Sequence, residues 1–404
     1  MGSFVALVAL SASAERLDPT VPIRWMVGHP NGYSSMQRLD AARSGRSRVP
    51  FPRDPVVLFR VRLPAPLAAP LVVDAHGKLV VATTDGRITE LDDQGRLEWS
   101  TLLDGAVSQS PVLTVDGTRV AVTDGGQVVG LGPDGHERYR ARVGGGGRSA
   151  ALATDDDAVI VASATRLARF GPFGELQATV ETGEPVVSLV GAATPTYAAT
   201  ESGDVFEWTR STGLRQVADL EGHPASDLVQ LGRWSLLAVV RDVGLVEVDL
   251  RDGTRVVRAN PAPDAFLGAP IMTPSGELRA TTAAGFVLGY QGGRETLRLS
   301  LGRGTATGTG ASVSGAGPLV DPTGVMGFAT ADGLAGVVLP SNEVHAVRVE
   351  GCGAPLGVAV AGPSRLAVAC ASGEVVVLAE RAAIGVPASA RLRGRPGARD
   401  ASGY

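Results

Sequence analysis

The chain is poor in aromatic residues, histidine and cysteine. Phe, Trp and Tyr make up 4% of its 404 residues, and it contains five His and two Cys. A flat redox cofactor needs an aromatic plate and converging cations, and a metal site needs clustered His, Cys or carboxylates. No His pair or acidic loop with ligand spacing occurs. We therefore predict no catalytic residue, no metal site and no cofactor.

A charge excess and a long apolar run are also absent. With 37 basic and 41 acidic residues, the net charge is −4. This balance argues against nucleic acid as a partner, because phosphate binding needs an excess of cations. The longest apolar stretch near the start, Phe4 to Leu10, is far shorter than the ~20 residues of a membrane-spanning helix. We expect no transmembrane segment.

The apolar stretch itself has two interpretations. Small residues follow it, and Ala12-Ser13-Ala14 has the form of a signal-peptidase site. Residues 1–14 are therefore predicted to be a signal peptide, and the protein to be periplasmic or extracellular. No Lys or Arg precedes Phe4, and an apolar N-terminus without a targeting role is the alternative.

Glycine and proline, by contrast, are abundant, with 53 and 26 residues. Together with many Val and Leu, they indicate short strands joined by turns and argue against a helical bundle. The segments Pro70 to Leu103 and Pro111 to Val143 align with each other, each as four short apolar segments separated by turn residues. Six more copies with weaker similarity follow, with a period of about 40 residues, which is typical of propeller blades.

This pattern predicts an all-β chain that folds as a single eight-bladed β-propeller of four-stranded antiparallel blades. The eighth unit shows only three strands, and the strand-like segment Pro55 to Leu63 has no place in the first unit. We therefore expect this N-terminal strand to close the ring as the outer strand of blade eight. The predicted organisation is a lead segment at 15–54, the propeller at 55–380 and a flexible basic tail at 381–404.

The repeats resemble a known family. The runs VATTDGRITELDDQGRLEWS, AVTDGGQVVGLGPDGHERY and AATESGDVFEWTRSTG are similar to the PQQ-like β-propeller repeat, and the resemblance extends over about Trp25 to Glu380. One branch of that family comprises quinoprotein dehydrogenases, which use PQQ and calcium. Another comprises non-enzymatic scaffolds such as the BamB-like component of outer-membrane β-barrel assembly. No Cys follows the apolar run, so the resemblance does not include the lipid anchor of that scaffold.

The length and the number of units resemble the scaffold branch. We therefore predict a non-catalytic member, an exported protein-binding or scaffolding module of the cell envelope. A quinoprotein-type, PQQ-dependent oxidoreductase is the alternative. The aromatic residues Trp99 and Trp208 fall on strand positions that favour packing between blades over a role as a cofactor plate.

The two cysteines, Cys352 and Cys370, both fall in the eighth unit. In an exported protein such a pair suggests a disulfide. Counting outward from the turn at Gly362 pairs Cys370 nearer Leu356 than Cys352, so a bridge requires a bend at Gly353 or Pro355. The sequence leaves open whether the two thiols are bridged.

A binding surface is predicted at one mouth of the ring. The longest connections between units are 221–226, 260–267, 302–317 and 349–355, and loops longer than a fold requires are often functional. A protein or peptide partner is expected there, with Phe266 and Leu267 as an apolar anchor beside Asp264. Loop drift without any partner is the alternative. We expect the protein to be a monomer.

Overall fold

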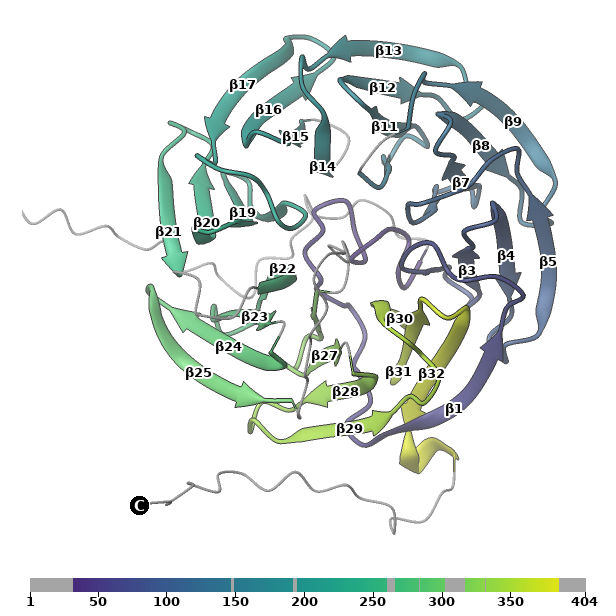
Figure 1. Cartoon of the computed structure of the whole chain (residues 1–404), viewed down its shortest axis with the longest axis vertical. Coiled ribbons are helices and arrows are strands. Elements are labelled where there is room, and N and C mark those ends of the chain that lie inside the picture. The colour runs from purple at the N-terminus through teal and green to yellow at the C-terminus, as the bar shows by residue number, and fades with distance from the viewer. Residues whose placement is uncertain are drawn as a thin grey trace, which may run out of the picture.

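The computed structural model describes residues 32–146, 149–191, 195–259, 266–282, 284–301, 317–330 and 332–384. These residues form eight four-stranded antiparallel sheets, which lie like blades around a central axis (Figure 1). The predicted eight-bladed propeller is therefore confirmed. Among the described residues, no helix has the length and apolar character needed to cross a membrane. The predicted signal peptide lies outside the described ranges.

Blades 1 to 7 each run in chain order from an innermost to an outermost strand. Blade 1 comprises β2 (Val72–Val73), β3 (Leu79–Ala82), β4 (Arg87–Leu91) and β5 (Leu97–Leu102); blade 2 comprises β6 (Val112–Leu113), β7 (Arg119–Val122), β8 (Gln127–Leu131) and β9 (Glu137–Arg142). Blade 3 comprises β10 (Leu152–Ala153), β11 (Val159–Ser163), β12 (Arg166–Phe170) and β13 (Leu176–Glu181); blade 4 comprises β14 (Val186–Val190), β15 (Thr196–Thr200), β16 (Asp204–Thr209) and β17 (Gly213–Asp219).

The second half of the ring repeats the same arrangement. Blade 5 comprises β18 (Val229–Gly232), β19 (Ser235–Val240), β20 (Gly244–Asp249) and β21 (Arg255–Ala259); blade 6 comprises β22 (Phe266–Met272), β23 (Leu278–Thr282), β24 (Phe286–Gln291) and β25 (Arg294–Ser300). Blade 7 comprises β26 (Leu319–Val320), β27 (Met326–Ala329), β28 (Leu334–Val338) and β29 (Val344–Arg348); blade 8 comprises β30 (Pro355–Gly362), β31 (Arg365–Cys370), β32 (Glu374–Glu380) and β1 (Pro55–Arg62).

The N-terminal strand closes the ring as predicted. Strand β1 pairs antiparallel with β32, in a register that sets Val57 opposite Leu378 and Val61 opposite Val375. A strand that directly precedes blade 1 in the chain is thus the outermost strand of blade 8, so the two ends of the propeller share one sheet. The predicted tail starts with a short 3-10 helix, η2 (Arg381–Ile384), and the rest of it lies outside the described residues.

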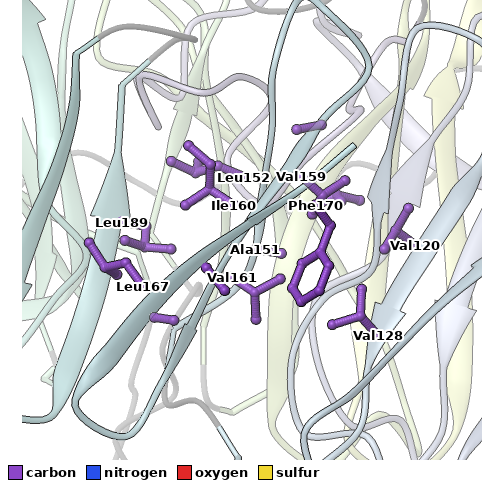
Figure 2. Close-up of a cluster of buried hydrophobic side chains, with 14 of the residues drawn as sticks. Val120, Val128, Ala151, Leu152, Val159, Ile160, Val161, Leu167, Phe170 and Leu189 are labelled. Atoms are coloured by element: carbon purple, nitrogen blue, oxygen red, sulfur yellow. The ribbon is translucent and has the colours of Figure 1, made fainter. Parts of the chain in front are cut away.

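The core consists of the faces between neighbouring blades. Strands such as β11 are buried along their whole length, whereas the outermost strands alternate between exposed and half-buried residues. Figure 2 shows how side chains of blade 3, among them Ile160 and Phe170, lie between Val120 of blade 2 and Leu189 of blade 4. A strand buried on both faces reads as a continuous apolar run, which explains the short Val- and Ala-rich segments of the sequence.

Three successive junctions between blades have the same contact, which we call the ring-on-glycine contact. An aromatic residue on the outermost strand of one blade lies over a positive-φ glycine in the β-turn before the outermost strand of the next blade. A Cβ atom added to that glycine would come within 2.7 Å or less of the aromatic ring. The pairs are Phe59 on Gly95, Trp99 on Gly135 and Tyr139 on Gly174.

We expect Trp99→Ala to lower the free energy of unfolding by about 1–3 kcal/mol, because it removes a half-buried aromatic contact between two blades. The indole Nε1 of Trp99 also donates a hydrogen bond to the carbonyl of Pro133, at 3.0 Å. Urea unfolding followed by circular dichroism measures the effect. Leu102→Ala is the matched control, since Leu102 lies on the same strand and is 56% exposed. Equal losses in the two variants would show that the junction contact contributes nothing of its own.

Candidate functional site in the central channel

The centre of the ring is occupied by the chain itself. Residues 32–54, here called the channel segment, run through the middle of the propeller before β1 begins (Figure 1). Its residues from Ser34 to Gly45 are almost all buried. A small ligand of a propeller usually binds in its channel. Here part of the predicted lead segment, 15–54, occupies that channel.

The channel segment bonds to the inner edges of the blades, one after another. Backbone amides of six blades donate hydrogen bonds of 2.7–2.9 Å to its carbonyl groups. They are Val73 to Ser34, Leu113 to Ser35, Gly191 to Ala41, Gln230 to Ala42, Val320 to Gly45 and, in the turn between β30 and β31, Ser364 to Pro50. Innermost strands of a sheet leave unpaired amides, which need partners when they are buried. The segment supplies those partners.

Two arginines of the channel segment bind the two remaining blades. Arg43 is 0% exposed, and it donates from Nη2 to the carbonyl of Ala150 in blade 3 at 2.8 Å and from Nε to that of Leu189 at 2.6 Å. Arg38 donates from Nη1 and Nη2 to the carbonyls of Ala269 and Pro270 in blade 6, at 2.6 and 2.7 Å. With these bonds, the segment has hydrogen bonds to all eight blades.

The same two arginines also hold the channel segment in its own shape. Arg38 Nε donates to the carbonyl of Arg43 at 2.9 Å, and Arg43 Nη1 donates to that of Gln37 at 3.3 Å. Arg38, Leu39 and Arg43 have positive φ angles of 60°, 80° and 48°. Non-glycine residues occupy this region only where the surroundings enforce it. The segment is therefore a tightly wound structure held by its contacts with the ring.

Two carboxylates accompany the arginines. Asp227 of blade 5 accepts a hydrogen bond from Gln37 Nε2 at 2.7 Å, and Asp40 accepts bonds from the backbone amide and hydroxyl of Ser44 at 2.9 and 2.6 Å. Burial lowers the pKa of Arg38 to about 10, although the negative charges of Asp227 and Asp40 oppose the shift. Burial raises the pKa of Asp40, which the bonds from Ser44 partly offset. The channel thus holds buried charges of both signs.

These residues suit a structural role better than a catalytic one. Each nitrogen atom of the two guanidinium groups donates a hydrogen bond to a backbone carbonyl, so both groups hold the protein's own backbone. Trp99, one of the candidate plates, lies on the outermost strand of its blade and contacts the next blade. Within the described ranges, no cluster of three His, Cys, Asp or Glu residues could hold a metal ion.

The predicted partner anchor is wrong for Phe266. Its side chain is 7% exposed, and it packs edge to face against Tyr290 with ring centroids 6.4 Å apart. Phe266 begins β22. It therefore lies on a buried inner strand and not in the loop that the sequence suggested. Leu267 lies on the same strand, where its backbone pairs with Thr281. Asp264 and most of the 260–267 and 302–317 loops lie outside the described residues.

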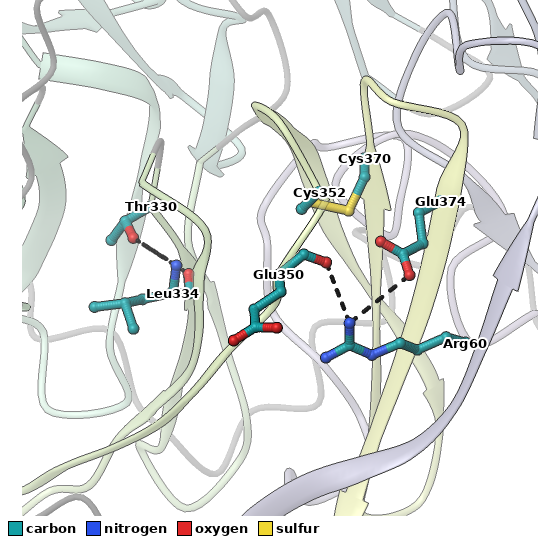
Figure 3. The surroundings of a disulfide bond; sticks show 7 residues. All are labelled: Arg60, Thr330, Leu334, Glu350, Cys352, Cys370 and Glu374. Atoms are coloured by element: carbon teal, nitrogen blue, oxygen red, sulfur yellow. Dashed lines mark hydrogen bonds and ion pairs between the residues drawn. A yellow bond between two sulfur atoms is a disulfide. The ribbon is translucent and has the colours of Figure 1, made fainter.

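The two cysteines are joined by a disulfide, with Cα atoms 4.9 Å apart (Figure 3). Gly353, which has a φ of +66°, and a register shift between Pro355 and Gly357 bend the chain between Cys352 and the body of β30. The connection is also tied to the closing strand, because Arg60 of β1 donates to the carbonyl of Glu350 at 3.1 Å and lies 3.8 Å from the carboxylate of Glu374.

Reduction of this disulfide is expected to lower the free energy of unfolding by about 2–4 kcal/mol, since it closes a loop with a sequence separation of 18. Melting with and without a reductant measures the loss. The double variant Cys352→Ser, Cys370→Ser should melt like the reduced protein and should not respond to reductant. Rapid alkylation of both cysteines in the native, unreduced protein would contradict the bridge.

Comparison with known proteins adds information on the fold only. No protein-family model matches the chain, and no curated protein matches its sequence. Among solved structures, a computationally designed protein, Ika8, is 14% identical with a TM-score of 0.64, and BamB from Moraxella catarrhalis is 15% identical with a TM-score of 0.46. Each match covers 80% of this chain and 99% of the other. The ring of eight blades agrees with the propeller fold that the repeats indicated.

Proposed function

We propose that the protein is an exported, non-enzymatic propeller that serves as a protein-binding or scaffolding module of the cell envelope. The observation that carries this proposal is the channel segment, which bonds to all eight blades and occupies the space in which a propeller would hold a small substrate or cofactor. With its channel filled, the molecule offers its outer surface for binding.

The repeat sequence and the propeller architecture support the same proposal, because rigid rings of this kind present loops and outer strands to protein partners. Export rests on the sequence alone, on the apolar stretch and the Ala12-Ser13-Ala14 motif. The disulfide is consistent with an oxidising compartment. A monomeric ring with a partner on its surface is the arrangement we propose.

The test is cross-linking in intact cells of the native host, followed by capture of the tagged protein from the envelope fraction. We expect one or a few proteins to be cross-linked reproducibly, and the captured chain to begin at or near Glu15. A chain with an intact N-terminus in the cytosol, or no cross-linked partner, would contradict the proposal. In parallel, PQQ with calcium should leave the melting temperature unchanged. A rise would favour the quinoprotein alternative.

A further inference from the structure

The junction between blades 3 and 4 lacks the aromatic residue of the three preceding junctions. In blades 1 and 2 the pairing of the two outer strands has a register shift, and the aromatic residue lies directly beside it. Trp99 is paired with Glu90 there, and Tyr139 with Gly130. In blade 3 the residue at this register position is Ala178, paired with Arg169. The ring-on-glycine contact has therefore lost its ring at this junction.

The glycine that would receive the ring is still present. Gly213 begins β17, directly after the turn before the outermost strand of blade 4, and has a φ of +72°. A Cβ atom added to Gly213 would meet no atom within 4 Å, whereas on Gly135 it would lie 2.5 Å from the ring of Trp99. The space is thus open where the neighbouring junctions are filled.

This open space is part of a surface groove of ≈ 590 Å³ between the two blades. One wall comes from β13 and the other from β16, the following turn and the start of β17. Trp208, which is only 6% exposed, contributes an indole. The lining residues are Gln177, Ala178, Thr179, Val180, Trp208, Thr209, Arg210 and Gly213.

The charge at the groove is positive. Arg210 is the one charged residue of the eight that line it, and its side chain is 57% exposed. Its ion-pair carboxylate, Asp156, is 3.9 Å away and already accepts a hydrogen bond from the buried Arg169 at 2.6 Å. Arg210 also donates a hydrogen bond from Nη2 to Oε1 of Gln177 on the opposite wall, so the guanidinium lies at the rim with a neutral partner and a distant, shared counter-charge. A guanidinium in this position favours both an aromatic face and a carboxylate.

We propose that this groove binds an aromatic side chain, flanked by an acidic residue, from an extended segment of a partner protein. Its occupant would replace, from outside, the ring that Ala178 does not supply. Tryptophan fits best, since the equivalent Trp99 adds a hydrogen bond from its Nε1 to a turn carbonyl. The inference rests on the proposed function as a protein-binding module, and it names the site and the chemistry of the partner.

The test uses peptides and the full-length protein labelled with ¹⁵N at its tryptophans. The probe is a blocked Asp-Trp-Asp tripeptide, with blocked Asp-Ala-Asp and Lys-Trp-Lys as controls. We expect the Asp-Trp-Asp peptide to shift the indole N–H signal of Trp208, identified by its loss in Trp208→Phe. The alanine peptide should have no effect, and the lysine peptide should bind roughly tenfold more weakly.

Two variants separate the groove from the rest of the surface. Ala178→Trp should fill the space from within, raise the melting temperature and weaken Asp-Trp-Asp binding at least about tenfold. Ala178→Ser, which keeps the space open, is the matched control and should bind as the wild type does. Arg210→Gln removes the positive charge and keeps a hydrogen-bond donor for Gln177, and it should remove the preference for acidic over basic flanking residues.

The outcomes also separate this inference from the proposed function. If no tryptophan peptide binds, or if Ala178→Trp binds the probe as tightly as the wild type, the groove is not an aromatic-binding site. If a partner is captured from cells equally well by the wild type and by Ala178→Trp, the scaffolding function stands and this site is wrong. If the peptide binds in the groove but cells yield no partner, the site stands and the proposed function fails.

Discussion

A chain that begins at Pro64 is expected to melt at least about 15 °C below the full-length protein, or to fail to fold. The deletion removes β1, whose pairing with β32 joins the two ends of the propeller in one sheet. Without β1, blades 1 and 8 meet only through side-chain packing, and the outer edge of β32 is unpaired. The deletion also removes the channel segment, so that each of the eight blades loses a hydrogen-bond partner.

A series of deletions assigns the loss to its two causes. A chain that begins at Gly32 is the reference, because it keeps both the channel segment and β1. A chain that begins at Pro55 keeps β1 but lacks the channel segment, and we expect its melting temperature to lie between those of the other two. Differential scanning calorimetry gives the order. If the chain that begins at Pro64 melts like the reference, neither ring closure nor the filled channel contributes to stability.

The fold was predictable because the same pattern of short strands and turns recurs along the sequence. The aligned units of blades 1 and 2 contain the same strands and the same turns, and the short apolar run of each buried strand is a local signal. The closing strand was predictable by counting, since Pro55 to Leu63 was one strand too many at the start and the eighth unit was one strand short. Local pattern and repeat number were sufficient for the architecture.

The filled channel was not predictable from local pattern. Arg38 and Arg43 bond to carbonyls that lie between 107 and 232 residues further along the chain, apart from the contacts within their own segment. An arginine in a Ser- and Gly-containing lead is usually a solvated residue. The available signal was the lead itself, which we separated from the propeller as residues 15–54. It contains Gly45, which has a φ of +65° and lies against the guanidinium of Arg38.

Phe266 and Ala178 show two limits of prediction from sequence: the first was predicted wrongly and the second was not predicted at all. Phe266, beside Asp264 in a long connection, suggested an exposed anchor, but strand pairing buries it. Ala178, by contrast, carries no signal of its own, because alanine is an ordinary strand residue. Its significance follows only from the repeat: the equivalent positions in the preceding blades hold Phe59, Trp99 and Tyr139. A small residue at a position that is aromatic in the three preceding blades marks a missing side chain, and a structure is needed to show that the space remains open.

Arg43→Met is expected to lower the free energy of unfolding by about 3–5 kcal/mol, because it leaves buried carbonyls of Gln37, Ala150 and Leu189 without their charged donor. Methionine has a similar length and no donor, so the loss of hydrogen bonds dominates over the loss of volume. Urea unfolding monitored by circular dichroism gives the value.

Arg48→Met changes an exposed residue of the same channel segment. It is the matched control and should change stability by less than about 0.5 kcal/mol. Arg43→Lys should destabilise almost as much as Arg43→Met, since one ammonium cannot reach three carbonyls that a planar guanidinium binds from separate nitrogens. If Arg43→Met unfolds within about 1 kcal/mol of Arg48→Met, the arginine does not hold blades 3 and 4 to the channel segment, and the argument that the filled channel is a structural hub fails with it.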